Sequence, residues 1–324
     1  MTQASAGLPR RRLGRTGFEI AALGMGAGWI GELPGVAEPA GDEQAIAAVR
    51  RAIDLGIDYF DTAPSYRSGR SERRLGLALR GGWRDHVRLA TKTGTHPRRR
   101  GDYSAAATIW TVEQSLRVLD TEVIDVLLVH DPQDMVPVLA PGGALEALER
   151  LKARGTLRAI GLGVRHHGHL RLAVESGRFD VIQTPYDYNL LRTTAAPLLA
   201  LAAAHDVGCI NASPYQQGLL AGIDPDEANA RRVATGARSA YAVDLERARV
   251  IWRWAQTQGA DLRAMAVQFC LREPRLAITL LGPRTATEVE EAVVAACTPV
   301  PEAHWTALEA LLPTLPPDAP ALTR

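Results

Sequence analysis

Short apolar runs recur along the chain, and each is followed by a loop and then by a segment of helical periodicity. Runs that are apolar at successive positions suit strands covered on both faces, as in a parallel sheet packed beneath helices. Eight such runs begin at Ile20, Ile57, Val87, Val123, Leu157, Phe179, Val207 and Leu276. The pattern therefore predicts eight strands that alternate with helices.

The segment from Asp42 to Gly56 illustrates why the intervening stretches are predicted to be helical. Ile46, Val49 and Ile53 share one face of a helix, because they are three or four positions apart. Asp42 is suited to cap the first turn, and Gly56 is suited to end the last one. Similar patterns occupy residues 108–119, 143–155, 198–208 and 286–296.

Eight strand–helix units in 324 residues predict a single α/β domain, residues 1–324, folded as a (β/α)8 TIM barrel with long loops at the C-terminal face. A doubly wound sheet is the alternative, but no G-x-G-x-x-G turn opens a helix after the first strand, since GMGAGWIG leads into Pro34 and Pro39. Residues 29–41 and 215–243 exceed ordinary loops and are expected on the active face. Residues 1–9 and 313–324 are expected to be peripheral.

Composition and charge argue against several classes of function. The chain is 46% hydrophobic, and its formal net charge of +1 provides no field that would attract nucleic acid or an anionic membrane. Three widely spaced cysteines without a Cys-x-x-Cys pair predict neither a disulfide framework nor a zinc ribbon. The N-terminus lacks the apolar stretch of a signal peptide, so a cytoplasmic location is expected. The basic run from Pro97 to Arg100 is interpreted as a solvated loop, with an anion contact as the alternative.

Ionisable residues stand at the ends of three consecutive predicted strands. Asp61 ends the run from Ile57, with Tyr66 on the following loop, whereas Lys92 and His130 end the next two runs. The C-terminal ends of barrel strands meet at one mouth, and aliphatic residues fill the barrel centre, so charged groups there need a reason.

Together these residues suit an acid–base relay for carbonyl reduction or alcohol oxidation. A tyrosine has a pKa of about 10 and donates a proton poorly unless a cation favours its phenolate. Lys92 would be that cation, and Asp61 would compensate the buried ammonium. A neutral His130 would orient the substrate oxygen while Tyr66 exchanges the proton. Singly, each polar strand end also has an ordinary interpretation, as a turn cap, a solvated lysine or a turn histidine.

The motifs around these residues resemble the aldo-keto reductase superfamily. The stretch GIDYFDTAPSYRSGRSERRLG is similar to that family's Asp-to-Tyr signature, TKTG to its lysine strand and LLVHDP to its histidine strand. SERRLG and LLVHDP are most similar to the branch of bacterial D-threo-aldose (L-fucose-type) and L-galactose dehydrogenases. The resemblance implies a barrel with Asp61, Tyr66, Lys92 and His130 as its catalytic tetrad and Tyr66 as the proton donor.

The resemblance also implies that NAD or NADP binds without a Rossmann fold. It places the cofactor contacts at Gln183, Ser213, Gly218, Leu219, Gly282, Arg284 and Glu288. The family's carboxamide-binding Ser and Asn fall on Gly163 and Val164, and its ring-stacking aromatic falls on Ala212, so these contacts are not carried over. Tyr215 is a candidate to replace the stacking ring.

Glu288 bears on the choice between the two cofactors. It occupies a position where many relatives have arginine or glutamine, close to Arg284, a candidate phosphate ligand. Ala292 stands where those relatives have an adenine-binding asparagine. A carboxylate would repel a 2′-phosphate, so weak NADP preference, or preference for NAD, is hypothesised.

Three other features have weaker interpretations. Trp29 and Trp110 are candidates for walls of the substrate pocket, although core packing explains them as well. His166 and His169 have no acidic or cysteine partner at ligand spacing, so a loop and helix start is preferred to a metal site.

The sequence thus predicts an NAD(P)-dependent oxidoreductase acting on a small carbonyl or sugar substrate, without a metal. An aldose dehydrogenase and a general aldehyde or ketone reductase would use the same four residues. A redox-sensing dinucleotide-binding protein with little turnover is the alternative, and a metal-dependent lyase using His130 and Asp131 is a more distant one.

Overall fold

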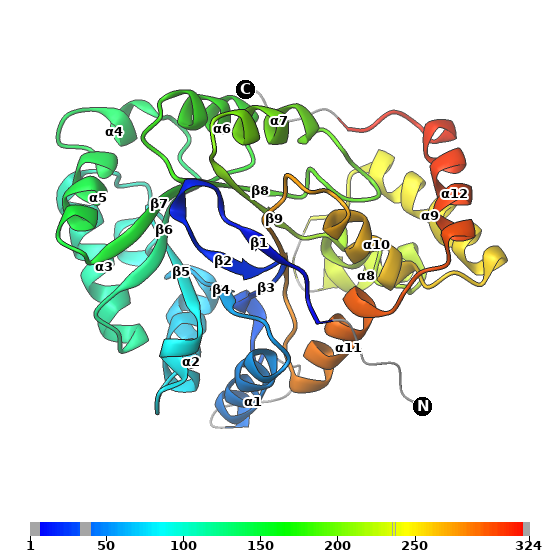
Figure 1. Ribbon diagram of the computed structural model, residues 1–324, viewed down its shortest axis with the longest axis horizontal. Helices are drawn as coiled ribbons and strands as arrows, with labels where there is room; N and C mark the ends of the chain where they lie inside the picture. The colour runs from blue at the N-terminus through cyan, green and yellow to red at the C-terminus, as the bar shows by residue number, and fades with distance from the viewer. Residues whose placement is uncertain (1–6, 33–39, 235, 237, 320–324) are drawn as a thin grey trace.

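The computed structural model describes residues 7–32, 40–234, 236 and 238–319. Within this part of the chain, eight parallel strands close into a barrel in the order β10-β3-β4-β5-β6-β7-β8-β9, which confirms the predicted (β/α)8 fold (Figure 1). The strands are β3 (Leu23–Gly26), β4 (Tyr59–Asp61), β5 (Arg88–Thr93), β6 (Ile124–His130), β7 (Leu157–Gly163), β8 (Val181–Pro185), β9 (Gly208–Ala212) and β10 (Ile278–Leu281).

Helices surround the barrel and cover the outward faces of its strands (Figure 1). They are α1 (Ala40–Asp54), α2 (Arg70–Ala78), α3 (Ala105–Leu119), α4 (Val136–Leu139), α5 (Ala144–Ala153), α6 (His167–Glu175), α7 (Ala196–Ala204), α8 (Pro225–Ala234), α9 (Ala242–Gln258), α10 (Leu262–Leu271), α11 (Ala286–Cys297) and α12 (Glu302–Leu311). The long loop after β9 therefore contains a helix of its own, α8, before α9 begins.

The first predicted strand is divided between two sheets. Residues Glu19–Ala21 form β2, which pairs antiparallel with β1 (Arg10–Arg12), and only Leu23–Gly26 enters the barrel as β3. The Ala22 N–H still donates to Pro9 O at 2.7 Å, so the hairpin continues up to the barrel strand. The single strand predicted from Ile20 was therefore wrong, because an apolar run does not reveal which partner each half pairs with.

The hairpin closes the N-terminal end of the barrel. Leu13 and Ile20 are fully buried and pack in one cluster with interior barrel residues such as Tyr59, Val126 and Ile210. Figure 1 shows β1 and β2 lying across the barrel in front of its strands. Because this hairpin closes the N-terminal end of the barrel, the polar strand ends meet at the opposite, C-terminal mouth.

Helix α1 begins at Ala40, two residues before the predicted N-cap, Asp42. The Asp42 carboxylate instead accepts hydrogen bonds from Arg73 at 2.8 Å and from Arg74 at 3.0 Å, which tie α1 to α2. The N-cap prediction was wrong because these long-range partners are not visible in the local sequence. Of the predicted long loop 29–41, residues 33–39 lie outside the described residues.

The described part of the C-terminal segment packs against the barrel helices. Leu315 is buried, and Asp318 forms an ion pair of 3.0 Å with Arg247 of α9. The Asp318 carboxylate also accepts a hydrogen bond of 2.7 Å from the backbone of Thr193. Residues up to 319 therefore contribute contacts beyond a purely peripheral role.

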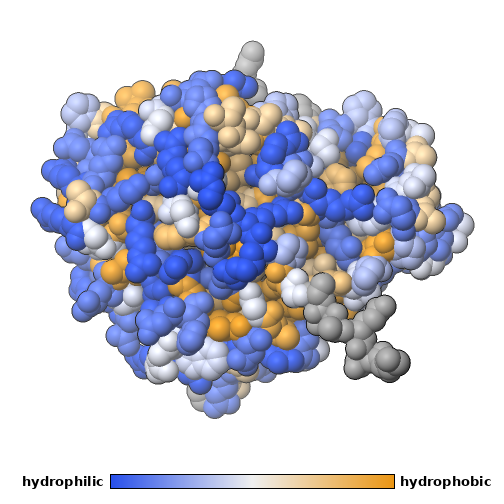
Figure 2. Space-filling model, in the orientation of Figure 1, coloured by the Kyte–Doolittle hydropathy of each residue, from blue (hydrophilic) through white to orange (hydrophobic). Residues whose placement is uncertain are grey.

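The surface facing the viewer in Figure 2 is largely hydrophilic, with apolar side chains visible between the charged ones. Among the described residues, no helix is both long and apolar enough to span a bilayer.

Candidate active site

The four predicted catalytic residues lie at the C-terminal ends of three adjacent strands. Asp61 ends β4, Lys92 lies near the end of β5 and His130 ends β6. Tyr66 follows β4 and opens the short turn η3 (Tyr66–Gly69). Because β4, β5 and β6 pair in that order, the barrel closure brings these side chains together at one mouth.

Lys92 and Asp61 form a buried ion pair. The Lys92 Nζ donates to Asp61 Oδ1 at 2.5 Å and to the Thr62 carbonyl at 2.8 Å, and both residues are almost fully buried. Burial alone would lower the pKa of the Lys92 ammonium, but its interactions with the Asp61 carboxylate and with Tyr66 raise it above its ordinary value. Lys92 is therefore a permanent cation at neutral pH.

Tyr66 lies against this cation. The Lys92 Nζ is 4.8 Å from the centre of the Tyr66 ring. Burial raises the pKa of the Tyr66 phenol, and Lys92 opposes that shift. The other side of the ring is backed by Gly28, where a Cβ atom would lie 3.3 Å from Tyr66 Cδ2, so a glycine allows the turn to approach closely. The phenol is protonated at rest and has a cation in place to stabilise its phenolate.

His130 completes the group as a neutral imidazole. Its ring meets the Tyr66 ring edge-on, with the centroids 6.0 Å apart. Burial lowers the pKa of His130 to about 3, with a further contribution from Lys92. Its Nδ1 is 2.9 Å from the Thr95 hydroxyl, which accepts in turn from Ser65 Oγ at 3.3 Å. A Thr95 hydroxyl that donates to Nδ1 leaves the proton on Nε2, where it can be donated to a ligand.

Unusual backbone conformations concentrate at the loops of the same mouth. Nine described non-glycine residues have positive φ, a conformation that is costly and is often found at functional sites. Seven of them follow barrel strands at the C-terminal face: Arg67, Ser68, Asp131, Tyr186, Ser213, Gln216 and Gln217.

Gln183 places a buried amide side chain at the mouth. Its side chain lies near the end of β8 and is buried, and Oε1 has no hydrogen-bond partner in the described structure. The neighbouring strand carries Gly163, where a Cβ atom would lie 3.2 Å from Oε1. An unsatisfied buried acceptor beside a missing side chain fits the N–H groups of a carboxamide. These residues thus fit the nicotinamide end of the expected cofactor.

The loop after β9 contains three of the residues expected at the diphosphate. Ser213 and Gly218 have φ values of +67° and +103°, and the Gly218 N–H donates to Tyr215 O at 2.9 Å within this turn. Leu219 is fully buried among helix side chains, and its N–H donates to Gln216 O at 3.4 Å.

Arg284 and Glu288 interact with each other. The Arg284 Nη2 lies 2.7 Å from Glu288 Oε1, and the Arg284 N–H donates to Glu288 Oε2 at 2.7 Å. Thr285 caps α11 by accepting from Glu288 N at 3.2 Å, and Gly282 lies just before this turn. The guanidinium that would meet a 2′-phosphate is therefore already paired with a carboxylate.

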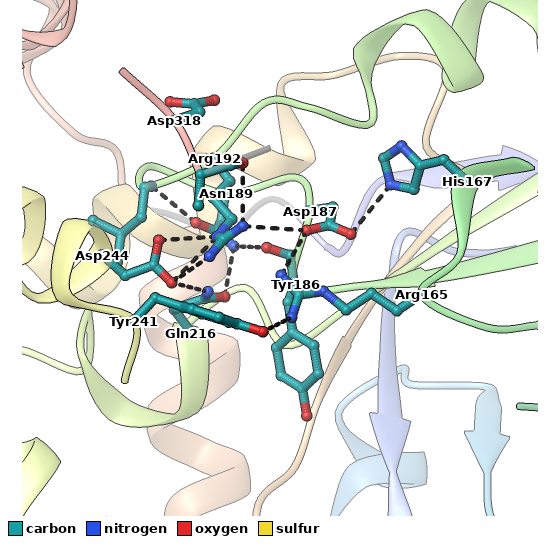
Figure 3. Close-up of polar contacts among 12 residues, drawn as sticks. Arg165, His167, Tyr186, Asp187, Asn189, Arg192, Gln216, Tyr241, Asp244 and Asp318 are labelled. Atoms are coloured by element: carbon teal, nitrogen blue, oxygen red, sulfur yellow. Dashed lines mark hydrogen bonds and ion pairs between the residues drawn. The ribbon is translucent and has the colours of Figure 1, made fainter. Parts of the chain in front are cut away.

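A buried polar network anchors the loop after β9, and sequence reasoning missed it (Figure 3). Arg192 is fully buried and pairs with Asp244, its Nη2 lying 2.8 Å from Oδ2. Gln216 donates to the same Asp244 oxygen at 3.0 Å and accepts from Asn189 at 3.1 Å. Gln216 thus fixes the backbone of the loop after β9, where the cofactor is expected. In the sequence, the signal for this buried network was Arg192, which directly follows the largely apolar stretch YNLL.

Arg165 extends this network toward the mouth. It follows β7 and pairs with the buried Asp187 at 3.2 Å, which also contacts His167 at 3.1 Å. The Arg165 guanidinium lies 5.3 Å from the Tyr241 ring, so the end of β7 and the start of α9 meet here (Figure 3).

The ring positions differ from the expected arrangement. Tyr215 packs partly buried between clusters formed by the surrounding helices. Ala212 is the register partner of Pro185, and the next residue, Tyr186, donates its N–H to Ala212 O at 3.0 Å. Tyr186 is therefore the aromatic side chain nearest in the strand register to the position where the family has its stacking ring.

The two tryptophans flank the tetrad's loops. Trp29 is 47% exposed, and the guanidinium carbon of Arg67 lies 3.2 Å from the centre of its ring. Arg67 directly follows Tyr66 in the sequence. Trp110 of α3 contacts His96, one residue after Thr95, with the ring centroids 4.7 Å apart. His166 caps α6 and stacks on His169 at 3.9 Å. Among the described residues, no group of three or more His, Cys, Asp or Glu side chains is placed to hold a metal ion.

Comparison with known proteins agrees with this geometry. Residues 22–313 match the model of the aldo/keto reductase family. The chain is 30% identical to L-galactose dehydrogenase from Arabidopsis thaliana over 88% of its length and 87% of that protein. It is 34% identical to D-threo-aldose 1-dehydrogenase from a Pseudomonas species, covering 64% of the chain and 70% of that protein.

Among solved structures, a holo-form aldo-keto reductase from Bacillus halodurans superposes with a TM-score of 0.77 at 21% identity, covering 98% of this chain and all of that one. That likeness concerns the fold. The family model, the relatives and the barrel agree, and the chain belongs to the aldo/keto reductase family.

Proposed function

We propose that this protein is an NAD-linked aldose 1-dehydrogenase in which Tyr66 exchanges the proton with the sugar. Its family and its dehydrogenase relatives support NAD(P)-dependent oxidoreduction of a carbonyl or aldose substrate. The observation that carries the proposal is the contact of a buried Lys92–Asp61 pair with the Tyr66 ring, beside a neutral His130.

In this proposal the bound nicotinamide supplies the site that accepts a hydride from C1 of the sugar. Tyr66 accepts the proton of the C1 hydroxyl, so the C–H and O–H bonds break and a carbonyl, that of a lactone, forms. Lys92 stabilises the phenolate that must be present before the proton arrives. His130 donates a hydrogen bond from Nε2 to the reacting oxygen, because its Nδ1 is occupied by Thr95.

The preference for NAD rests on the pairing between Arg284 and Glu288. A 2′-phosphate near Arg284 would have to compete with a carboxylate already bonded to the guanidinium. A ribose hydroxyl carries no charge and meets no such repulsion. The proposal therefore expects a higher kcat/KM with NAD than with NADP.

The test is oxidation of L-galactose and L-fucose with NAD, followed by NADH absorbance, in the wild type and in Tyr66→Phe. Loss of the proton acceptor should lower kcat by about 10²–10⁴ while NAD affinity is kept. Tyr59→Phe is the matched control, since Tyr59 lies on β4, is fully buried and has an unpartnered hydroxyl in the described structure. Turnover near the wild-type rate in Tyr66→Phe would reject the role of Tyr66. Tight NAD binding without turnover of any sugar would instead favour a redox-sensing protein.

A further inference from the structure

The loop after β5 holds a basic pocket next to the candidate active site. The backbone closes this loop on itself, because Gly101 N–H donates to Gly94 O at 2.8 Å. His96 stabilises the turn by accepting from Arg98 N at 3.1 Å. The loop is a fixed part of the barrel rim, since Tyr103 at its end donates from its hydroxyl to His130 O at 2.8 Å.

Three consecutive arginines and Trp110 line a pocket of about 370 Å³ in this loop, together with Asp102. The guanidinium carbons of Arg98 and Arg99 lie 5.5 and 5.0 Å from the centre of the Trp110 ring. Contact with an aromatic face restricts the long side chains, so less entropy is lost when they bind a ligand. The volume is within the lower part of the range found for small-molecule sites.

The charges of this pocket are mostly uncompensated. Asp102 pairs weakly with Arg99, at 3.8 Å. Arg98 and Arg100 have no carboxylate partner within the described residues. The whole chain has a formal net charge of only +1, so this excess of positive charge is a local feature and not a general basicity. Arginine forks match the oxygen geometry of a phosphate.

The pocket is close to the reacting groups. Thr95, whose hydroxyl lies 2.9 Å from His130 Nδ1, is three residues before Arg98. Three residues span at most about 10 Å, so the backbone of Arg98 lies within that distance of the backbone of Thr95. Burial raises the pKa of Asp131, the residue after His130, and the positive charges of Lys92 and Arg100 oppose that shift.

We propose that the loop of Arg98 to Arg100 and Trp110 form a subsite for the phosphate group of a phosphorylated aldose, whose C1 is held between Tyr66 and His130. This inference rests on the proposed function and specifies its substrate class. The phosphate would contact Arg98 and Arg100, and Trp110 would hold the Arg98 guanidinium in place.

The test measures binding without turnover. Tyr66→Phe protein saturated with NAD is titrated by calorimetry with D-arabinose and with D-arabinose 5-phosphate. The phosphorylated sugar is expected to bind at least about tenfold more tightly, and the preference should shrink toward about 1 M salt, because exposed charges are screened. Adding Arg98→Gln and Arg100→Gln should abolish the preference. Arg117→Gln, which removes an exposed arginine at the far end of α3, should leave it unchanged.

Equal affinity for the two sugars, or a phosphate preference that survives the double substitution, would overturn the proposal. Binding of inorganic phosphate at the loop with no gain for the sugar phosphate would also overturn it, since the pocket would then be separate from the substrate site. If the wild type oxidises no sugar at all, the proposed function fails, and the calorimetric comparison still decides whether the arginines bind a sugar phosphate.

Discussion

The buried Lys92–Asp61 pair offers a way to separate structure from catalysis. Lys92→Met removes the ammonium while keeping a side chain of similar length. The Asp61 carboxylate, 3% exposed, then loses the partner that lies 2.5 Å away. An uncompensated buried charge costs about 3–5 kcal/mol, which for a chain of 324 residues lowers the thermal midpoint by about 4–7 °C.

Adding Asp61→Asn to Lys92→Met should restore most of this lost stability, because both buried charges are gone. Activity should not return with it. Without the ammonium, nothing counters the burial that raises the pKa of Tyr66, so kcat should stay about 10²–10⁴ below the wild type. Thermal unfolding by circular dichroism and NADH formation with L-galactose measure the two quantities.

The second lysine of the chain supplies the control. Lys152 pairs with Asp180 at 2.6 Å but is 39% exposed, so Lys152→Met should cost at most about 1 kcal/mol and leave kcat unchanged. A double variant that regained both stability and near wild-type kcat would refute the reasoning, because the pair would then serve only the fold. A single Lys92→Met variant as stable as the wild type would refute the predicted loss of stability.

Three further predictions concern other parts of the site. His130 has a pKa lowered to about 3 by burial, so its contribution to stability should be fully present above about pH 6.5 and fall as the pH drops toward 3, and the loss measured by pH-dependent unfolding should be smaller in His130→Gln. Glu288→Gln frees Arg284 and should raise the NADP/NAD ratio of kcat/KM by up to about tenfold, roughly 1.4 kcal/mol; an unchanged ratio contradicts the proposed basis of NAD preference. Asp244→Asn breaks a buried ion pair and should cost about 3–5 kcal/mol and weaken NAD binding in a fluorescence titration, whereas Asp226→Asn, in an exposed pair, should leave both stability and NAD binding nearly unchanged; equal effects would contradict the anchoring role.

Three of the four expected site residues could be located from sequence because each lies at the C-terminal end of a strand of the same parallel barrel, and Tyr66 lies on the loop after the first of these strands. Asp61, Lys92 and His130 occupy neighbouring strands, and the barrel closure alone brings such ends together. Lys92 is easy to single out, because only two of the 37 lysine and arginine residues in the chain are lysines. The apolar pattern of the strands and the geometry of a barrel were therefore enough to predict that these side chains lie close together.

Contacts between distant segments were beyond the same reasoning. The arginine partners of Asp42 are about thirty residues away, and the partner of Arg192 is Asp244, on a helix beyond the long loop. The Arg284–Glu288 pair is local, at one helical turn, yet its orientation toward the cofactor position depends on how α11 docks on the barrel.

The sequence by itself determined the eight-fold alternation of strands and helices, because periodicity is a property of consecutive residues. It also determined which ionisable side chains end consecutive strands. The tertiary structure decided that the first apolar run is divided between the β1–β2 hairpin and a barrel strand. It also decided that the Tyr186 N–H donates to Ala212 O. It also decided that Trp110 of α3 lies against the arginine loop, with the guanidinium carbons of Arg98 and Arg99 5.5 and 5.0 Å from the centre of its ring. These outcomes depend on which surfaces meet after the chain folds, and burial and charge pairing across long sequence separations select them.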